Sequence, residues 1–278
     1  MKEEMILEAR DVWYSYEEND QFSLQGLDLK VKRGSKVAFM GANGCGKSTF
    51  FLCCNGILRP QKGSILFHGQ PISYQRKELL SLRAKVGIVF QDPDKQLFSA
   101  SVEQEISFGV LNLGATKEAA RSAVDQVIEA LEITPFRKHP VHALSGGQKK
   151  QVSIADILVM NPEIIILDEP AAALDPKHAR MVNQMVDQLT EQGITVMMAT
   201  HDIDYAYAWA DEIVLMKEGR VLCQGSPKEV CQKTELLTET NLEEPAVLRL
   251  FRRLEKRGLI HETENVPRTW GELERLLE

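Results

Sequence analysis

A glycine-rich loop constrains the fold of this chain more than any other segment. It follows a short apolar run from Lys36 to Met40, which has the character of a strand. It precedes a helical pattern from Ser48 to Asn55, which ends before Pro60 and Gly63. Strand, loop and helix therefore follow one another, as the G-x-x-x-x-G-K-[ST] pattern requires. The loop reads Gly41-Ala42-Asn43-Gly44-Cys45-Gly46-Lys47-Ser48.

The residues of this phosphate loop indicate nucleotide binding. Its glycines allow backbone N–H groups to turn inward around phosphate oxygens, at a helix N-terminus that already favours negative charge. Lys47 would reach the β and γ phosphates, and the hydroxyl of Ser48 would bind Mg²⁺. A chance glycine-rich turn is the alternative, and the placement of the loop between strand and helix disfavours it.

Alternating strands and helices indicate a parallel sheet with helices on both faces. Two strands precede the phosphate loop: Ile6 to Tyr16, with Ile6, Val12, Tyr14 and Tyr16 on one face, and a strand around Leu24, Leu27, Leu29 and Val31. The later strands are short, apolar and largely β-branched. They are Val86 to Phe90, Ile164 to Leu167, Ile194 to Ala199 and Ile213 to Met216.

Polar residues follow three of these strands. Asp168 and Glu169 come directly after Ile164 to Leu167, at the strand end where ligands bind in open α/β sheets. Asp168 suits the Mg²⁺ shell, and Glu169 suits a general base that polarises the attacking water. His201 and Gln91 follow two other strands. Each of these two is, on position alone, better explained as a structural group.

Composition limits the class of protein. The chain has 278 residues, of which 44% are apolar, enough for one core and a small appendage. No apolar run approaches the roughly 18 residues of a membrane span, and Met1-Lys2-Glu3-Glu4 lacks the features of a signal peptide. We therefore expect a cytoplasmic protein with reduced cysteines. The net charge of −7 disfavours broad attraction to nucleic acid.

Helical patterns extend the core in two places. Lys117 to Leu131 is amphipathic and lies in a helical insertion at about residues 95–160 of a domain spanning residues 1–230. Residues 231–278 form a C-terminal helical extension. Pro245 can begin one helix there, ended by Gly258, and Thr269 to Glu272 has capping-box spacing for another. Packing of these helices on the parent core is favoured over a dimer contact.

The motifs as a set resemble the nucleotide-binding subunits of ABC transporters over roughly residues 5–230. The resemblance implies a RecA-like P-loop NTPase core of α/β class with an N-terminal antiparallel β subdomain, an inserted α-helical signature subdomain and ATP hydrolysis with ATP and Mg²⁺. It identifies Leu144 to Gln148 as the signature segment, and Glu169, His201 and Gln91 as catalytic. Metal ligands are then Ser48, Gln91 and Asp168. The implied nucleotide contacts are Tyr16, Gly41, Asn43, Gly44, Cys45, Gly46, Lys47, Ser48, Thr49, Ser145, Gly146, Gly147, Gln148, Asp168 and Asp175.

The single signature segment implies a dimer. In the family, Ser145 and Gly147 of one subunit close over the γ-phosphate held by Lys47 of the other. The partner is either a second copy or a related ATPase. Three residues depart from the family pattern, since Gln151 stands for an arginine, Ala171 for a threonine and Cys45 for a small residue. None of them removes a required catalytic group, although Gln151 puts the packing of the signature helix in question.

A finer resemblance concerns Phe90 to Phe98 and the tail from Pro267 to Leu273, which look like the ATPases of energy-coupling-factor importers. It implies a transmembrane coupling subunit, a substrate-capture membrane subunit, and a place at the cytoplasmic face of the membrane. The cobalt and nickel type is the closer in appearance, and the vitamin type is the alternative. Asp92 to Phe98 is the candidate groove for the membrane subunit, unless it is an ordinary loop with its apolar end folded inward.

Two other functions compete with the importer ATPase. A soluble ABC ATPase of translation or repair is disfavoured, because such proteins usually carry two cassettes, a basic linker or a long coiled coil. A non-enzymatic nucleotide-gated scaffold is disfavoured because Lys47, Asp168, Glu169 and His201 are all present. Turnover of ATP and co-purification with a membrane protein distinguish the three.

Overall fold

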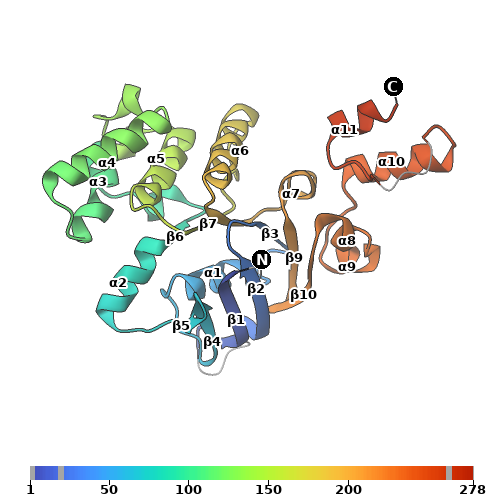
Figure 1. Ribbon diagram of the computed structural model, residues 1–278, viewed down its shortest axis with the longest axis horizontal. Coiled ribbons are helices and arrows are strands. Elements are labelled where there is room, and N and C mark those ends of the chain that lie inside the picture. The colour runs from blue at the N-terminus through green and yellow to red at the C-terminus, as the bar shows by residue number, and fades with distance from the viewer. Residues whose placement is uncertain (1–3, 18–21, 261–264, 278) are drawn as a thin grey trace.

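A six-stranded sheet runs through the centre of the computed structural model, which describes residues 4–17, 22–260 and 265–277 (Figure 1). Met1 to Glu3, most of the segment considered for a signal peptide, lie outside the described residues. So do residues 261–264 and 278 of the C-terminal extension. No helix in the described part of the chain is both long and apolar enough to cross a bilayer.

The central sheet has the strand order β10-β9-β3-β8-β7-β6. All neighbours from β9 to β6 are parallel, and β10 is antiparallel to β9 at the edge. The turn between β9 and β10 was not predicted from the sequence. In the structure Glu218 and Gly219 both have positive φ, as tight hairpins require. The strands are β3 Lys36–Met40, β6 Val86–Val89, β7 Ile164–Asp168, β8 Thr195–Ala199, β9 Glu212–Lys217 and β10 Arg220–Gly225.

A second, antiparallel sheet has the order β2-β1-β4-β5. The alternation expected for Ile6 to Tyr16 is wrong, because Ile6 and Leu7 are both buried and the strand ends at Tyr14. Asp11 adopts a φ of 47°, and the pairing register shifts between Ala9 and Val12. Such a bulge changes which face the later side chains occupy. The strands are β1 Met5–Tyr14, β2 Leu24–Lys32, β4 Lys62–Phe67 and β5 Gln70–Pro71.

The two faces of the central sheet pack against different layers. Ala38 and Met40 lie in a core with the helices that follow β7 and β8. Val37 and Phe39 lie in a second core with α1 and the antiparallel sheet, where the ring centroids of Phe39 and Phe51 are 5.0 Å apart. Helices were expected on both faces of the central sheet. One face is covered by α1 together with the antiparallel sheet. The helices are α1 Lys47–Cys54, α2 Arg76–Lys85, α6 Pro176–Glu191 and α7 Ile203–Trp209.

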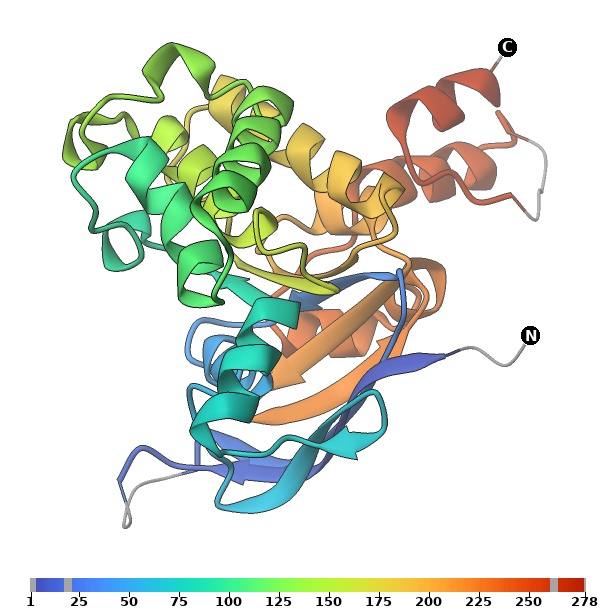
Figure 2. The ribbon, with the colours of Figure 1, turned by 60° about the vertical axis from the view of Figure 1, so that its left-hand side comes forward.

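Helices between β6 and β7 form a lobe to one side of the sheet (Figure 2). The amphipathic helix predicted from Lys117 is present as α4, capped by Thr116 and with Val124 and Ile128 buried. The lobe contains η1 Pro93–Lys95, α3 Val102–Asn112, α4 Lys117–Ala130, η2 Thr134–Phe136, η3 Val141–Ala143 and α5 Gly146–Leu158. It extends the helical core, since α5 packs on both α3 and α6.

The C-terminal helices project from α7 and α8 at the far side of the molecule (Figure 1). Val247, Phe251 and Leu273 lie in the same core as the helical face of the sheet, so packing on the parent core is confirmed. Thr269 caps α11, but the predicted capping box is incomplete because Glu272 accepts from the N–H of Arg268 instead. The helices are α8 Pro227–Cys231, α9 Thr234–Glu239, α10 Ala246–Lys256 and α11 Trp270–Arg275. All five cysteines are free and buried.

Candidate functional site

Three glycines give the phosphate loop its shape. The φ angles are 144° at Gly41, 77° at Gly44 and 107° at Gly46, a region that residues with a Cβ rarely occupy. A Cβ on Gly41 would lie 2.1 Å from the carbonyl oxygen of Met216, and one on Gly46 would lie 2.7 Å from that of Ser23. Both positions therefore require glycine for space as well as for conformation. Gly44 faces open space, where a ligand can approach its backbone.

Lys47 begins α1, and its side chain turns back over the loop. Its Nζ donates to the carbonyl oxygen of Gly41 at 2.8 Å and to that of Ala42 at 3.2 Å. The residue is only 6% exposed, and the equally buried Cys45 places its Sγ 3.7 Å from the same nitrogen. The ammonium group is thus held inside the loop by neutral acceptors. A phosphate oxygen would be a stronger acceptor for it, because it carries charge.

Tyr16 and Thr49 meet at the first turn of α1. The Tyr16 hydroxyl lies 3.1 Å from Oγ1 of Thr49, which brings the segment after β1 to the phosphate loop. Tyr16 is 59% exposed, whereas Tyr14 is partly buried in the second core. The two rings pack edge to face at 5.2 Å between centroids. An exposed ring beside the loop favours Tyr16 over Tyr14 as the residue that would stack on adenine.

Ser48 and Asp168 present oxygen atoms toward each other across the site. The Ser48 hydroxyl hydrogen-bonds to the carboxylate of Asp168, which is 8% exposed at the end of β7. Burial raises the pKa of Asp168, and the bond from Ser48 opposes that rise. Hydroxyl, carboxylate and amide oxygens are donors that Mg²⁺ prefers, and Gln91, whose Nε2 donates to the adjacent Glu169, can supply the amide oxygen. The residues therefore fit that ion.

Glu169 lies between two side chains from neighbouring strand ends. Its Oε1 is 2.6 Å from Nε2 of His201, and its Oε2 accepts from Nε2 of Gln91 at 2.9 Å. The three residues meet because β6, β7 and β8 are adjacent and parallel, so their carboxyl ends share one edge. Glu169 has a φ of 47°, a strained conformation typical of functional sites. The predicted position of each residue after a strand is confirmed, and the structure brings them into contact.

The signature segment caps α5 and packs against α6. Oγ of Ser145 accepts from the N–H of Gln148, whose side-chain oxygen accepts from the N–H of Ser145 at 3.0 Å. Gly147 packs so closely that a Cβ there would lie 2.3 Å from the ring of His178. Asp175 caps α6 through two backbone N–H groups and also pairs with the His178 ring. The glycine is therefore needed for the contact between α5 and α6.

The signature segment stays apart from the phosphate loop within one chain. In the described part of the structure, no hydrogen bond or ion pair joins Leu144–Gln148 to Gly41–Ser48. Ser145 and Gly146 are exposed at the start of α5. One chain thus gathers the phosphate loop, the two acids, Gln91 and His201, and leaves the N-terminus of α5 outside this group.

Lys150 is a residue of this region that the sequence patterns did not reveal. It is 1% exposed, and its Nζ donates to the carbonyl oxygens of Phe90 at 2.8 Å and Gln91 at 2.9 Å. Burial lowers its pKa to about 8, so the charged form still prevails at pH 7. The sequence did contain one indication that Lys150 is buried. Ile154 lies one helical turn later on the same face, and α5 carries apolar residues around most of its circumference.

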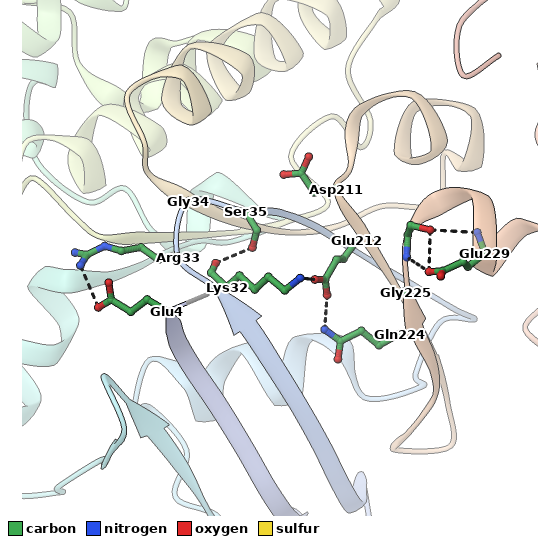
Figure 3. Close-up of a pocket in the computed structure, with 11 residues that line it drawn as sticks. Glu4, Lys32, Arg33, Gly34, Ser35, Asp211, Glu212, Gln224, Gly225 and Glu229 are labelled. Carbon is green, nitrogen blue, oxygen red and sulfur yellow. Dashed lines mark hydrogen bonds and ion pairs between the residues drawn. The ribbon is translucent and has the colours of Figure 1, made fainter. Parts of the chain in front are cut away.

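A cavity of about 760 Å³ lies at the amino ends of β3 and β9 (Figure 3). Two of its charged groups pair with each other: Lys32 lies 3.3 Å from Glu212, which also accepts from Gln224 at 2.6 Å. Ligands of open α/β sheets bind at the carboxyl ends of the strands, so this cavity is not the candidate site. A smaller cavity of about 280 Å³ does reach Glu169 and His201.

Known sequences are similar to this chain. Residues 24–172 match the model of the ABC transporter family. The energy-coupling factor transporter ATP-binding protein EcfA of Methanocaldococcus jannaschii is 42% identical over 96% of this chain and 93% of its own length. That of Methanococcus maripaludis is 44% identical over 90% of each chain. A longer relative, from Methanosarcina mazei, is 43% identical over 97% of this chain. This chain spans 59% of the length of that relative.

Solved structures agree with the sequence comparison. The structure of cbiO1 from Clostridium perfringens, described as part of the ABC transporter complex cbiONQ, has a TM-score of 0.76 and 44% identity, covering 90% of this chain and 100% of that one. A dimeric ATP-binding cassette bound to ADP and phosphate has a TM-score of 0.72 and 28% identity, covering 80% and 99%. This chain therefore belongs to the ABC transporter family, as an ATP-hydrolysing, ATP-binding subunit of the energy-coupling-factor type.

Proposed function

We propose that this chain powers the uptake of a transition-metal ion, cobalt or nickel, through a membrane partner. The observation that carries its catalytic part is Glu169, held between Gln91 and His201 beside the Ser48–Asp168 pair. The loop after β6 is shared by metal and vitamin importers of this type, and the substrate class is supported by the chain as a whole, which looks closer to the cobalt-type ATPase. The 44% identity to cbiO1, part of the complex cbiONQ, also supports it. A vitamin importer with the same kind of ATPase is the alternative.

ATP would lie along the carboxyl edge of the central sheet. The ring of Tyr16 would stack on adenine, with Thr49 below it. Backbone N–H groups from Asn43 to Gly46 would surround the phosphates at the start of α1. Lys47 would exchange its two carbonyl acceptors for oxygens of the β and γ phosphates. The exposed positions of Asn43 and Gly44 leave that side of the loop open to the ligand.

Ser48, Asp168 and Gln91 are the residues that would hold Mg²⁺. When bound, the ion neutralises charge on the β and γ phosphate oxygens. The hydrogen bond from Ser48 keeps the Asp168 carboxylate in place at the end of β7. The Nε2 of Gln91 is already committed to Glu169, so its amide oxygen is the atom available for the phosphate side of the site.

Glu169 would act as the general base. It would accept a proton from the water that attacks the γ-phosphate, a role that contributes about 10²- to 10⁴-fold to rates. Both of its oxygens are engaged, one by His201 and one by Gln91. Contact of His201 with the γ-phosphate would release Oε1 for the water. The base would therefore become available only when the phosphate is in place.

A dimer would complete the site. Ser145 and Gly147 of one subunit would close over the γ-phosphate bound by Lys47 of the other, with Asp175 at the same interface. Charge-assisted hydrogen bonds contribute about 1.5–3 kcal/mol each, so four across two sites give roughly 6–12 kcal/mol. Association costs an estimated 4–15 kcal/mol. Because the ranges overlap, the closed dimer should form with ATP and relax after hydrolysis.

The surface after Gln91 supports contact with a membrane subunit. Phe98 is 68% exposed and Phe108 is 46% exposed, and their rings meet edge to face at 5.0 Å. Leu97, by contrast, packs against the core. The ordinary loop considered as the alternative would fold both apolar residues inward, and only Leu97 does so. An exposed aromatic pair at the end of this loop suits the apolar face of a helix from the membrane subunit.

Uptake by a reconstituted complex tests the proposal. The chain would be co-expressed with a membrane scaffold and a substrate-capture subunit, placed in liposomes with internal ATP, and given Co²⁺, Ni²⁺ or riboflavin outside. We expect uptake of Co²⁺ or Ni²⁺ that Glu169→Gln abolishes. Uptake of riboflavin alone would replace the metal with a vitamin. Failure of the chain to form a complex with the co-expressed membrane scaffold, with its ATP hydrolysis unimpaired, would contradict an importer role.

A further inference from the structure

The segment of residues 90–98, here called the Gln91 loop, is attached to α5 by a buried cation. Lys150 is 1% exposed and donates to two consecutive carbonyl oxygens, those of Phe90 at 2.8 Å and Gln91 at 2.9 Å. A buried ammonium group is unfavourable unless charge-assisted hydrogen bonds compensate it. Such bonds are roughly twice as strong as neutral ones. The loop backbone on both sides of the Gln91 Cα is therefore tied to the helix.

Three further contacts bind the same loop to the same helix. Nε2 of Gln96 donates to the carbonyl oxygen of Ser153 at 2.9 Å and to Oδ2 of Asp156 at 3.3 Å. Lys149 forms an ion pair with Asp94 at 2.6 Å. The Gln91 loop and α5 are thus joined over two helical turns. A displacement of α5 would carry the loop with it, because packed elements with such networks move as units.

The helix connects two parts of the proposed site. Its first turn is the signature segment, with Ser145 as the N-cap. Lys150 lies five residues further along, above the backbone of Gln91. The side chain of Gln91 in turn donates to Glu169 at 2.9 Å. A continuous set of contacts therefore runs from the signature segment through Lys150 and Gln91 to the carboxylate of Glu169.

We propose that Lys150 is a positioning residue that couples the signature segment of α5 to Gln91 and Glu169. When the N-terminus of α5 engages the phosphate of a partner subunit, Lys150 moves the Gln91 backbone with the helix and sets the position of Glu169. The catalytic constellation is then complete only in the closed dimer. This inference rests on the roles of Glu169 and Gln91 in the proposed function.

Two variants on the same helix separate positioning from packing. Lys150→Met keeps the length and apolar stem of the side chain and removes the ammonium group. Gln151→Leu is a matched control, because Gln151 is also buried and also donates to a backbone carbonyl, that of Leu131 at 3.3 Å. That carbonyl lies at the end of α4, away from the Gln91 loop. Both variants remove hydrogen bonds made by a buried side chain of α5, two in Lys150→Met and one in Gln151→Leu, and only Lys150→Met loses the connection to the loop.

ATP turnover and hydrogen exchange provide the readouts. We expect Lys150→Met to lower kcat between about 10- and 100-fold with KM for ATP nearly unchanged, because small misplacements of catalytic groups cost rates of this size. Gln151→Leu should stay within about 2-fold of wild type at a temperature well below both melting points. Lys150→Arg, which keeps a cation, should recover part of the lost kcat.

Exchange of the loop amides distinguishes coupling from general loosening. In a Glu169→Gln background, which retains ATP, ATP should protect residues 90–98 and the first turn of α5 together. Adding Lys150→Met should leave the protection at α5 and remove it at the loop. Lys150→Gln serves as the second variant if the methionine variant does not fold. Equal loss of kcat in Lys150→Met and Gln151→Leu, or unchanged loop protection, would overturn the inference.

Failure of the wider proposal has a different outcome. If Glu169→Gln hydrolysed ATP at the wild-type rate, the assigned role of Glu169 would be wrong whatever Lys150 did. If Glu169→Gln were inactive while Lys150→Met kept the wild-type kcat, the role of Glu169 as general base would be supported and the positioning role of Lys150 would be wrong. The two variants measured side by side therefore test the two statements separately.

Discussion

The imidazole of His201 lies 2.6 Å from the carboxylate of Glu169, and this contact joins the ends of β8 and β7. The other carboxylate oxygen accepts from Gln91 at the end of β6. Both carboxylate oxygens of Glu169 are therefore engaged by neighbouring side chains. A general base held by two neighbouring side chains is oriented for catalysis.

Glu169→Gln should lower the rate of ATP hydrolysis by about 100-fold or more, because the amide cannot accept a proton from water. ATP binding requires other residues, so the variant should retain ATP and accumulate as a dimer. Gel filtration with and without ATP and Mg²⁺ measures this shift. A variant that remains monomeric with saturating ATP would count against the shared site.

His201→Ala should reduce kcat with little change in ATP affinity. The imidazole contacts Glu169 and would reach only the γ-phosphate, whereas Tyr16 and Lys47 would make most ground-state contacts with ATP. His68→Ala is the matched control, since His68 also lies 2.9 Å from a glutamate, Glu163, but away from the phosphate loop. Steady-state turnover and nucleotide titration of both variants give the comparison. Equal effects would remove any special role for His201.

Gly147→Ala and Gly146→Ala should change the melting temperature in opposite directions. A Cβ on Gly147 would come within 2.3 Å of the His178 ring, whereas one on Gly146 would meet Leu174 at 3.8 Å, an ordinary contact. Both glycines are helical, and alanine in place of glycine stabilises a helix by up to about 1 kcal/mol. Thermal unfolding should therefore show a gain at Gly146 and a loss at Gly147. A gain at both would mean that α6 relaxes away from α5.

Much of this architecture could be predicted from local patterns. The phosphate loop, the apolar strand before Asp168 and the helix that Thr116 caps each have a signal within about ten residues. Their positions in the structure follow from parallel strands, whose carboxyl ends meet at one edge. The contact of Gln91, Glu169 and His201 is a consequence of strand order. Predicting this contact therefore required only the fold class in addition to the sequence.

The remaining features depend on contacts between distant segments. The bulge at Asp11 and the pairing of β1 with β4 arise from tertiary packing that no short window contains. Lys150 and Lys149 are adjacent and chemically identical, yet one is buried against the Gln91 loop and the other pairs with Asp94 near the surface. Only the packing of α5 against that loop distinguishes them.

Asp156 should make the stability of this protein decrease as pH rises. Burial raises its pKa to about 7, and Glu105 adds to the rise, while the hydrogen bond from Gln96 opposes it. The unfolded value is near 4, so between about pH 4 and pH 7 the folded state holds a proton that the unfolded state has released. This contribution to stability is present in full below the pKa that Asp156 has in the unfolded state. It is lost as pH rises through the pKa that Asp156 has in the folded state.

Asp156→Asn tests this pH dependence, because an amide of the same shape does not titrate. We expect the melting temperature of the wild type to fall between pH 5 and pH 8 and that of the variant to fall less, so that the variant is the more stable at pH 8. Asp94→Asn, an exposed aspartate on the Gln91 loop, is the control and should follow the wild type, apart from the loss of its surface ion pair with Lys149. Parallel curves for wild type and Asp156→Asn would show that this carboxyl is ionised in the folded protein throughout the range, and that the helix accommodates its charge.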